Sequence, residues 1–418
     1  MEFTPLQLVA TVIFTIAVAH TFLTKYFERL AHVYPNHAGL FHLLGEVEAV
    51  FGFWALLLML VMVAMVGQSD TIGYLEGRNY TEPMFVFVIM VVAASRPVMS
   101  LVKDSVLGLA LRLPGHTRMV LMLLILFIVP LLGSFITEPA AMTLAALPLR
   151  DIIFNQHASH WLRYGALGVL FVNVSIGGTL TSFAAPPVLM VAAKWNWDMA
   201  FMLSHIGWRA TIACFINAAA LVLLFRRELC AHPHLNEPSR REVPLSVSVV
   251  HVLFLAAVVV FAHHPVIFMG LFLFFLGYTT AYKAYQSPLI LREALMVAFF
   301  LAGLVVLGGM QDWWLKPALL SMDSSAVYYG ATALTAITDN AALTYLGSLV
   351  EGLSEEFKIS LVMGAVTGGG LTLIANAPNP AGAAILKVRF SDQAISAKDL
   401  FLAASLPTLV AIVCMRFI

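Results

Sequence analysis

Runs of about 20 consecutive apolar residues recur along the whole chain, and a run of that length can cross a bilayer as one helix. Hydrophobic residues make up 61% of the 418 residues and charged residues only 11%. The 23 basic and 23 acidic residues leave no net charge and no basic surface for a nucleic acid. Three widely spaced cysteines form neither a disulfide framework nor a cysteine-based zinc site. The sequence therefore excludes a soluble enzyme and predicts an all-α polytopic membrane protein whose surroundings are the lipid bilayer.

Two of the apolar runs, 118–154 and 324–354, are too long for one helix and are interrupted in the middle by polar residues. The first breaks at Thr137-Glu138-Pro139 and the second at Thr338-Asp339-Asn340. Proline removes a helix hydrogen bond, and Asp-Asn favours caps and turns. We interpret both runs as re-entrant hairpins, because irregular backbone inside a membrane is tolerated only within protein or beside a wet cavity.

About ten further runs are expected to be full transmembrane helices. If the two hairpins do not cross, most of the 23 Lys and Arg residues fall on one side, which the positive-inside rule assigns to the cytoplasm. The N-terminus is then exterior, the first hairpin opens from the cytoplasm and the second opens from the exterior. The expected crossing runs are 5–24, 46–66, 84–102, 160–191, 199–225, 245–262, 266–282, 290–310, 357–386 and 399–418.

The sequence contains an internal repeat. The segment Ile136-Thr137-Glu138-Pro139-Ala140-Ala141-Met142-Thr143 aligns with Ile337-Thr338-Asp339-Asn340-Ala341-Ala342-Leu343-Thr344, with five of eight positions identical and one carboxylate exchanged for the other. A second pair of motifs follows the two tips, with coincident Gly-Gly and Ala-Pro positions that would break a helix in mid-membrane. These motifs are Gly177-Gly178-Thr179-Leu180-Thr181-Ser182-Phe183-Ala184-Ala185-Pro186-Pro187 and Gly369-Gly370-Leu371-Thr372-Leu373-Ile374-Ala375-Asn376-Ala377-Pro378-Asn379.

The repeat divides the chain into halves at 1–225 and 245–418, joined by a cytoplasmic linker at 226–244. Each half is expected to hold three scaffold spans, a hairpin, a broken helix (160–191 or 357–386) and a last span. Because each half has an odd number of crossings, the second half must be inserted upside down. Two inverted-topology repeats with broken helices at the midplane are typical of secondary transporters. The alternative is that the Gly-Pro breaks merely kink ordinary helices.

The layout and the four motifs resemble the ion transporter superfamily, and within it the bacterial sodium/proton antiporters. The closest likeness lies in the tips Ile-Thr-Glu-Pro-Ala-Ala and Ile-Thr-Asp-Asn-Ala-Ala and in Ala-Asn-Ala-Pro-Asn-Pro-Ala-Gly at 375–382. This resemblance implies ion sites at the tips and broken helices, an elevator-type alternating access and a homodimer in the bacterial inner (plasma) membrane. Dicarboxylate carriers of the superfamily place a neutral Ser-Asn-Thr at each tip, whereas this chain places Glu138 and Asp339 there.

Two acids facing one cavity repel an anion and suit Na⁺ or a proton, and burial favours the neutral form of a carboxylic acid. Hard cations prefer oxygen ligands. The alternative for each acid is a structural ion pair with Arg209 or Arg96, and for the threonines it is a bond back to the helix carbonyls. With Na⁺ expected at Glu138 and Asp339, the candidate ion- and proton-binding residues are Thr137, Glu138, Thr338, Asp339, Asn340, Gly177, Gly178, Thr179, Thr181, Gly370, Thr372, Asn376 and Asn379.

Three functions compete at this point. The leading hypothesis is a secondary Na⁺/H⁺ antiporter in which the two ions exclude each other at the tip carboxylates. The alternatives are a sodium-coupled carrier of a small anion or oxyanion, and a passive channel or structural membrane protein. The sequence has no Walker loop, Rossmann glycine pattern or catalytic-triad spacing, so neither an enzyme nor a cofactor is implied. The energy would come from an ion gradient.

Overall fold

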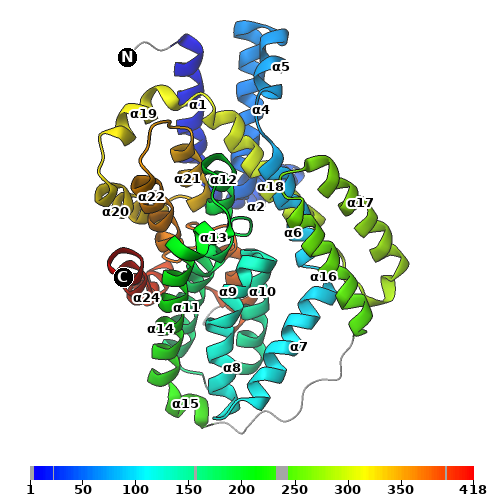
Figure 1. Ribbon diagram of the computed structural model, residues 1–418. Helices are drawn as coiled ribbons and strands as arrows, with labels where there is room; N and C mark the ends of the chain where they lie inside the picture. The colour runs from blue at the N-terminus through cyan, green and yellow to red at the C-terminus, as the bar shows by residue number, and fades with distance from the viewer. Residues whose placement is uncertain (1–3, 22, 155–157, 232–242, 391–392) are drawn as a thin grey trace.

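The computed structural model describes residues 4–21, 23–154, 158–231, 243–390 and 393–418, and this part of the chain is built from helices and the turns between them (Figure 1). Most of the linker expected at 226–244 lies outside the described residues. The helices of the first half are α1 (Pro5–Thr21), α2 (Thr24–Val33), α3 (Ala38–Gly45), α4 (Val47–Val66), α5 (Gln68–Glu76), α6 (Thr81–Ala93), α7 (Arg96–Arg112), α8 (Thr117–Leu126), α9 (Ile128–Ile136), α10 (Glu138–Pro148), α11 (His160–Gly177), α12 (Pro186–Trp195), α13 (Met199–Met202), α14 (Trp208–Leu224) and α15 (Arg226–Cys230).

The second half of the chain contains fewer helices in its described residues. Its helices are α16 (Leu245–Val260), α17 (Pro265–Ala281), α18 (Leu291–Gly308), α19 (Asp312–Leu320), α20 (Ser324–Thr335), α21 (Asn340–Ser348), α22 (Glu355–Gly368), α23 (Asn379–Leu386) and α24 (Ala397–Phe417). Short turns of π-helix at Leu149–Ile153 (η2) and Leu203–Gly207 (η4), and of 3-10 helix at Pro35–His37 (η1), Gly178–Leu180 (η3), Lys283–Tyr285 (η5) and Lys387–Arg389 (η6), connect them.

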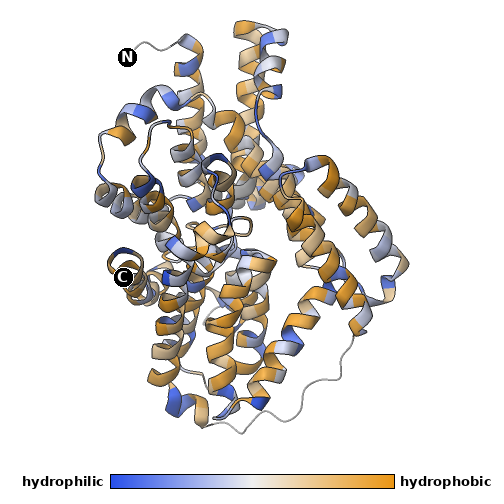
Figure 2. Ribbon diagram, in the orientation of Figure 1, coloured by the Kyte–Doolittle hydropathy of each residue, from blue (hydrophilic) through white to orange (hydrophobic). Residues whose placement is uncertain are grey.

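Several helices are long and apolar enough to cross a membrane. Within the described residues, five continuous spans satisfy that test on length and composition: Ala49–Val66, Thr117–Ile136, Met199–Leu224, Leu291–Gly308 and Ala397–Phe417. One bent pair, α6 with α7, passes as a sixth, and α1, α16 and α17 are shorter apolar helices. The ribbon is apolar along most helix lengths and hydrophilic near many helix ends (Figure 2). The chain is a multi-pass membrane protein.

The outer helices expose large apolar side chains, as a surface in contact with lipid does. Leu60 on α4 is 61% exposed, Phe274 on α17 is 75% exposed and Leu406 on α24 is 70% exposed. In water, such residues would form apolar patches of the kind that soluble monomers avoid. Phe171 on α11, in contrast, is completely buried, so the centre of the molecule is packed by its own side chains.

The third predicted span, 84–102, is not one straight helix. The structure has α6 and α7 there instead, bent by 61° at Ala94–Ser95. Ser95 has an extended backbone, and Pro97 lies in the first turn of α7, where its missing N–H leaves no bond unmade. Arg96, expected in the middle of a span, lies at the start of α7 after the bend.

The hairpins and broken helices from the two halves pack against each other reciprocally. Helix α10, the second arm of the first hairpin, contacts α23, which follows the second break. Helix α21, the second arm of the second hairpin, contacts α12, which follows the first break. Helix α11 also contacts α22. The arms α8 to α10 occupy the lower part of the molecule and α20 with α21 the upper part (Figure 1). An inverted repeat would produce this reciprocal pattern, with both tips at the centre.

Candidate functional site

The first tip turns sharply at Thr137, between the end of α9 and the start of α10. Thr137 has φ 78° and ψ 151°, a conformation that a β-branched residue rarely adopts. Pro139 follows in the first turn of α10, where its ring fits without loss of a hydrogen bond. Thr137 is 3% exposed and Glu138 is completely buried. The strained residue therefore lies directly before the buried acid, as strained residues at functional sites often do.

The Glu138 carboxylate lies between the two broken segments. Its Oε2 atom accepts a 2.8 Å hydrogen bond from Nδ2 of Asn376 in the second half. Its Oε1 atom is buried and has no hydrogen-bond partner among the described residues. A Cβ atom added to Gly178 would lie only 2.6 Å from that Oε1 atom, so the glycine leaves the space that the carboxylate occupies. Glu138 thus joins its own hairpin to both breaks.

The second tip holds its acid differently. Asp339 caps α21, and its Oδ1 atom accepts hydrogen bonds from the backbone N–H groups of Ala341 at 2.8 Å and Ala342 at 3.1 Å. Asp339 and Thr338 are only partly buried. The next residue, Asn340, is completely buried, and its backbone N–H donates to the carbonyl of Ala375 at 3.3 Å. This bond ties the second tip to the second break.

The first break is held to the first hairpin through hydroxyl groups. Thr181 donates from Oγ1 to the carbonyl of Ser134 at 2.5 Å, and Ser134 donates from Oγ to the carbonyl of Gly177 at 2.7 Å. Thr179 instead donates to the carbonyl of Ile176, three residues back in the chain, at 2.6 Å. Thr179 therefore bonds to a carbonyl of its own helix, which was the predicted alternative to an ion-binding role. Thr181 instead links the first break to the first hairpin.

The second break has a corresponding set of contacts. Thr372 donates from Oγ1 to the carbonyl of Ala336 at 2.8 Å, and Ala336 directly follows α20, the first arm of the second hairpin. Asn379 donates from Nδ2 to the carbonyls of Gly369 and Thr372, both at 2.8 Å. A Cβ atom on Gly370 would lie 2.4 Å from the Cα atom of Val172, so only glycine permits the close approach of α11 at this point.

Buried oxygen atoms collect around these contacts without hydrogen-bond partners in the described part of the chain. Native proteins leave few buried polar atoms unpaired, so such a group needs an explanation. Amide, hydroxyl and carboxylate oxygens are also the ligands that hard cations prefer. The unpaired oxygens of the site are Glu138 Oε1, Thr335 Oγ1, Asn340 Oδ1, Asn376 Oδ1 and Asn379 Oδ1.

Two cavities reach the site. A cavity of about 40 Å³ is lined by Asp339 and Asn376 among apolar residues of α18 and the second break. A larger one, of about 350 Å³, extends from Thr137 on the first tip to Arg292 and Glu46, which form a 2.6 Å ion pair. The larger cavity therefore reaches the first tip at Thr137, and the smaller one borders Asp339, while the buried Glu138 lines neither of the two.

Arg209, one of the two arginines that could have paired with a tip acid, makes other contacts. Arg209 donates from Nη1 to the carbonyl of His205 on its own helix at 2.8 Å, lies over the Trp208 ring and approaches the sulfur of Met363. The described contacts of Arg209 thus do not include Glu138 or Asp339. Within the described residues, no group of three or more His, Cys, Asp or Glu side chains could hold a metal ion.

Sequence reasoning missed Ser134, Thr335 and Ser175. Ser175 donates from Oγ to the carbonyl of Val366 at 2.7 Å and so joins the two broken helices. Ser134 and Thr335 occupy equivalent places, three residues before the threonine of each tip. Extending the alignment of the tips by two residues would have found this pair, because both positions carry a hydroxyl group.

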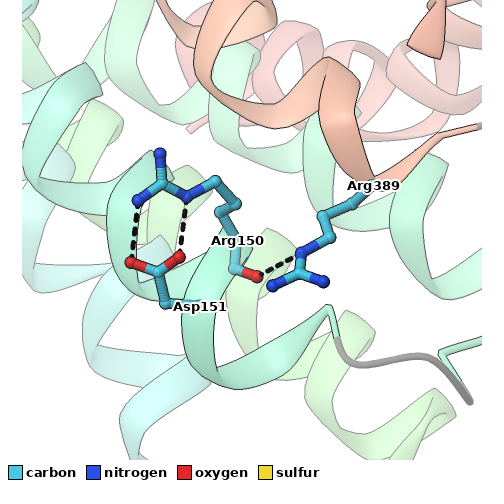
Figure 3. Close-up of polar contacts among 3 residues, drawn as sticks. All are labelled: Arg150, Asp151 and Arg389. Atoms are coloured by element: carbon cyan, nitrogen blue, oxygen red, sulfur yellow. Dashed lines mark hydrogen bonds and ion pairs between the residues drawn. The ribbon is translucent and has the colours of Figure 1, made fainter.

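The far end of the first hairpin is held by arginines. Arg389, directly after α23, donates from Nε to the carbonyl of Arg150 at 3.0 Å, and Arg150 forms a 2.7 Å ion pair with Asp151 (Figure 3). Arg118 of α8 donates to the carbonyl of Ile152 at 2.6 Å. The Arg150 guanidinium lowers the pKa of the Asp151 carboxyl from its usual value. Helices α10 and α23 are therefore joined at both ends.

One comparison with known proteins decides the family. The model of the family described as "Putative Na+/H+ antiporter" matches residues 5–418. The chain belongs to this family. This membership confirms the relationship that the tip motifs indicated and makes the chain a cation/proton antiporter of the membrane. No curated protein matches the chain.

Proposed function

We propose that this antiporter exchanges Na⁺ for H⁺ at a midplane site formed by the two hairpin tips and the two breaks. Glu138 and Asp339 supply the charge, and the other candidate residues supply oxygens or the backbone shape around them. The observation that carries this proposal is the Glu138 carboxylate, which is completely buried, holds one bond from Asn376 and leaves its second oxygen without a partner in the described residues. A buried acid of this kind either takes a proton or binds a cation.

The ions exclude each other because a cation and a proton cannot both neutralise the same site. Alternating access would move a transport unit, consisting of both hairpins and both broken helices, against the remaining helices. The contacts of α10 with α23 and of α12 with α21 support this division, because they hold elements from the two halves together. A homodimer in a bacterial inner membrane, with its N-terminus exterior, completes the proposal.

The direct test is ion flux in proteoliposomes with opposed pH and Na⁺ gradients. An outward Na⁺ gradient should drive uptake of protons, and an imposed pH gradient should drive Na⁺ flux. Substitution of Na⁺ by Li⁺ or K⁺ then ranks the ions. Flux that does not saturate with Na⁺, or that ignores the pH gradient, would favour a channel. Flux that needs an added anion would favour the sodium-coupled carrier. The described contacts of Arg209 do not place this arginine beside either tip acid.

The topology of the first hairpin can be tested separately by cysteine labelling. Leu113 and Trp161 flank the hairpin and are 40% and 74% exposed. After replacement of the exposed Cys230, single cysteines at these two positions should both react from the cytoplasmic side. Reaction from opposite sides would mean that the hairpin crosses the membrane, and the inverted repeat would then be wrong.

A further inference from the structure

An ion pair lies at the outer end of the cavity that reaches the first tip. Arg292, the second residue of α18, donates from Nη2 to Oε1 of Glu46 at 2.6 Å. The side chain of Arg292 is 69% exposed and that of Glu46 is 32% exposed. Thr137, which lines the same cavity of about 350 Å³, is only 3% exposed. The cavity therefore has its mouth at the ion pair and its buried end at the tip.

Helix stability does not explain why these two residues occupy their positions. Glu46 is the N-cap residue of α4, yet its side chain makes no cap hydrogen bond and turns to Arg292 instead. Arg292 lies in the first turn of α18, where the partial positive charge of a helix N-terminus disfavours a cation. An exposed ion pair also adds little to stability. The position of the pair at a cavity mouth therefore calls for another role.

The charges at the mouth do not cancel. The charged residues in the described lining of the cavity are Glu46, Arg292 and Glu293, so one negative charge remains after the ion pair is formed. Glu293 is exposed and follows Arg292 directly in α18. Much of the wall between the mouth and the tip is apolar and includes Met90 and Met296. Walls of low dielectric constant focus the field of such charges and raise the local concentration of counter-ions.

We propose that Glu46 selects cations for entry at this mouth by neutralising Arg292. With Glu46 in place, Glu293 keeps the mouth negative, and a small cation is concentrated there before it reaches the tip. Without Glu46, an unpaired guanidinium would stand at the mouth, and the lining would carry no net charge. This inference rests on the proposed function, because the mouth serves the site at the tips. Glu46 and Arg292 act on entry from the opposite end of the cavity to Thr137.

The experiment measures initial rates of Na⁺-driven proton exchange in membrane vesicles of both orientations. The Na⁺ concentration is varied while N-methylglucamine chloride holds the ionic strength at about 0.1 M. Removal or exposure of one unit charge near the ion path should change the apparent KM for Na⁺ about threefold and leave the maximal rate unchanged. This change should appear when Na⁺ is added on the face that holds Arg292, which is the face proposed as cytoplasmic.

The sign of the change distinguishes an electrostatic role from a structural one. Glu46→Gln should raise the KM, Arg292→Gln should lower it, and the double variant should return it to within about 1.5-fold of the unmodified protein, because its net charge at the mouth is restored. A pair that only holds α4 to α18 would give the same change in all three variants, since each lacks the ion pair. At an ionic strength of about 1 M, where the Debye length is about 3 Å, the changes should shrink below about 1.5-fold.

Asp151→Asn is the matched control. Asp151 belongs to another partly exposed ion pair, with Arg150 at 2.7 Å, and neither residue lines this cavity. The control should therefore leave the KM for Na⁺ unchanged. Changes of the same sign in Glu46→Gln and Arg292→Gln, or an unchanged KM on both faces of the membrane, would overturn the inference while the exchange itself stands. Absence of Na⁺-driven exchange in the unmodified protein would instead contradict the proposed function, and this inference with it.

Discussion

The two hairpin tips align residue by residue, yet their acids occupy different environments. Asp339 folds back on its own helix, where two N–H donors stabilise its negative charge. Glu138 is one methylene longer, and its carboxylate accepts a hydrogen bond from Asn376 in the second half of the chain. Aspartate is a good helix cap. Under the proposed function, this difference in environment leads us to expect that the two positions divide the work, with Glu138 taking the proton and Asp339 remaining charged as a cation ligand.

The two tips should differ most in their effect on exchange when the charge of each acid is removed, in the variants Glu138→Gln and Asp339→Asn. Glu138→Gln should reduce Na⁺-driven proton exchange by more than about a hundredfold, because the proton carrier is gone. Asp339→Asn should retain pH-dependent binding but weaken Na⁺ about tenfold, since asparagine still caps α21 and only the charge is lost. Flux in proteoliposomes and calorimetry distinguish the two effects. Equal losses in both variants would mean that the acids act as one pair.

Side-chain length gives the next test. Glu138→Asp should shorten the reach by one methylene, break the 2.8 Å contact with Asn376 and reduce exchange about tenfold or more. Asp339→Glu should mainly weaken the cap of α21, at a cost of about 1 kcal/mol in stability. Thermal unfolding should therefore respond to the second variant and flux to the first. The reverse pattern would mean that Asp339, and not Glu138, is the acid whose side-chain length matters for exchange.

Gly178→Ala should displace the carboxylate without touching the second tip. The added Cβ would lie 2.6 Å from Oε1 and 2.9 Å from Cγ of Glu138, so the acid must move. We expect exchange to fall several-fold while the protein still folds, because the obstructed group is the end of a side chain. A matched change, Gly370→Ala, meets the backbone of Val172 instead and should lower thermal stability. Normal flux in Gly178→Ala would mean that the position of Glu138 is not critical.

The smallest effect is expected at the far end of the first hairpin, where Asp151 pairs with Arg150. Arg150 lowers the pKa of Asp151 in the folded protein, so the pair adds stability above the unfolded value of about 4 and loses it as pH falls through the lower folded value. Because both side chains are partly exposed, Asp151→Asn should cost only about 0.2–1 kcal/mol. Thermal unfolding near neutral pH measures this loss, which should vanish in strong acid.

Sequence patterns located the interruptions of the helices well, because glycine, proline and polar residues in apolar runs have local physical effects. The tips at Thr137 and Asp339 and the breaks after Gly178 and Gly369 are all irregular in the structure. The bend before Arg96 was missed, although Ser95 and Pro97 signal a helix start. The partner of Glu138 could not be foreseen, because the 2.8 Å contact with Asn376 joins residues 238 positions apart and depends on how both halves pack.

The double attachment of α10 to α23, through Glu138 and Asn376 at one end and Arg150 and Arg389 at the other, has a consequence for local motion. Because α10 and α23 are hydrogen-bonded to each other at both ends, α10 cannot move away from α23 alone, and neither helix can unfold without breaking contacts of the other. Amide hydrogen exchange in the two helices should therefore proceed through one cooperative opening. Ions would gain access by displacement of this pair as a rigid body, and the protonation of Glu138 would set how firmly one of its two fastenings holds.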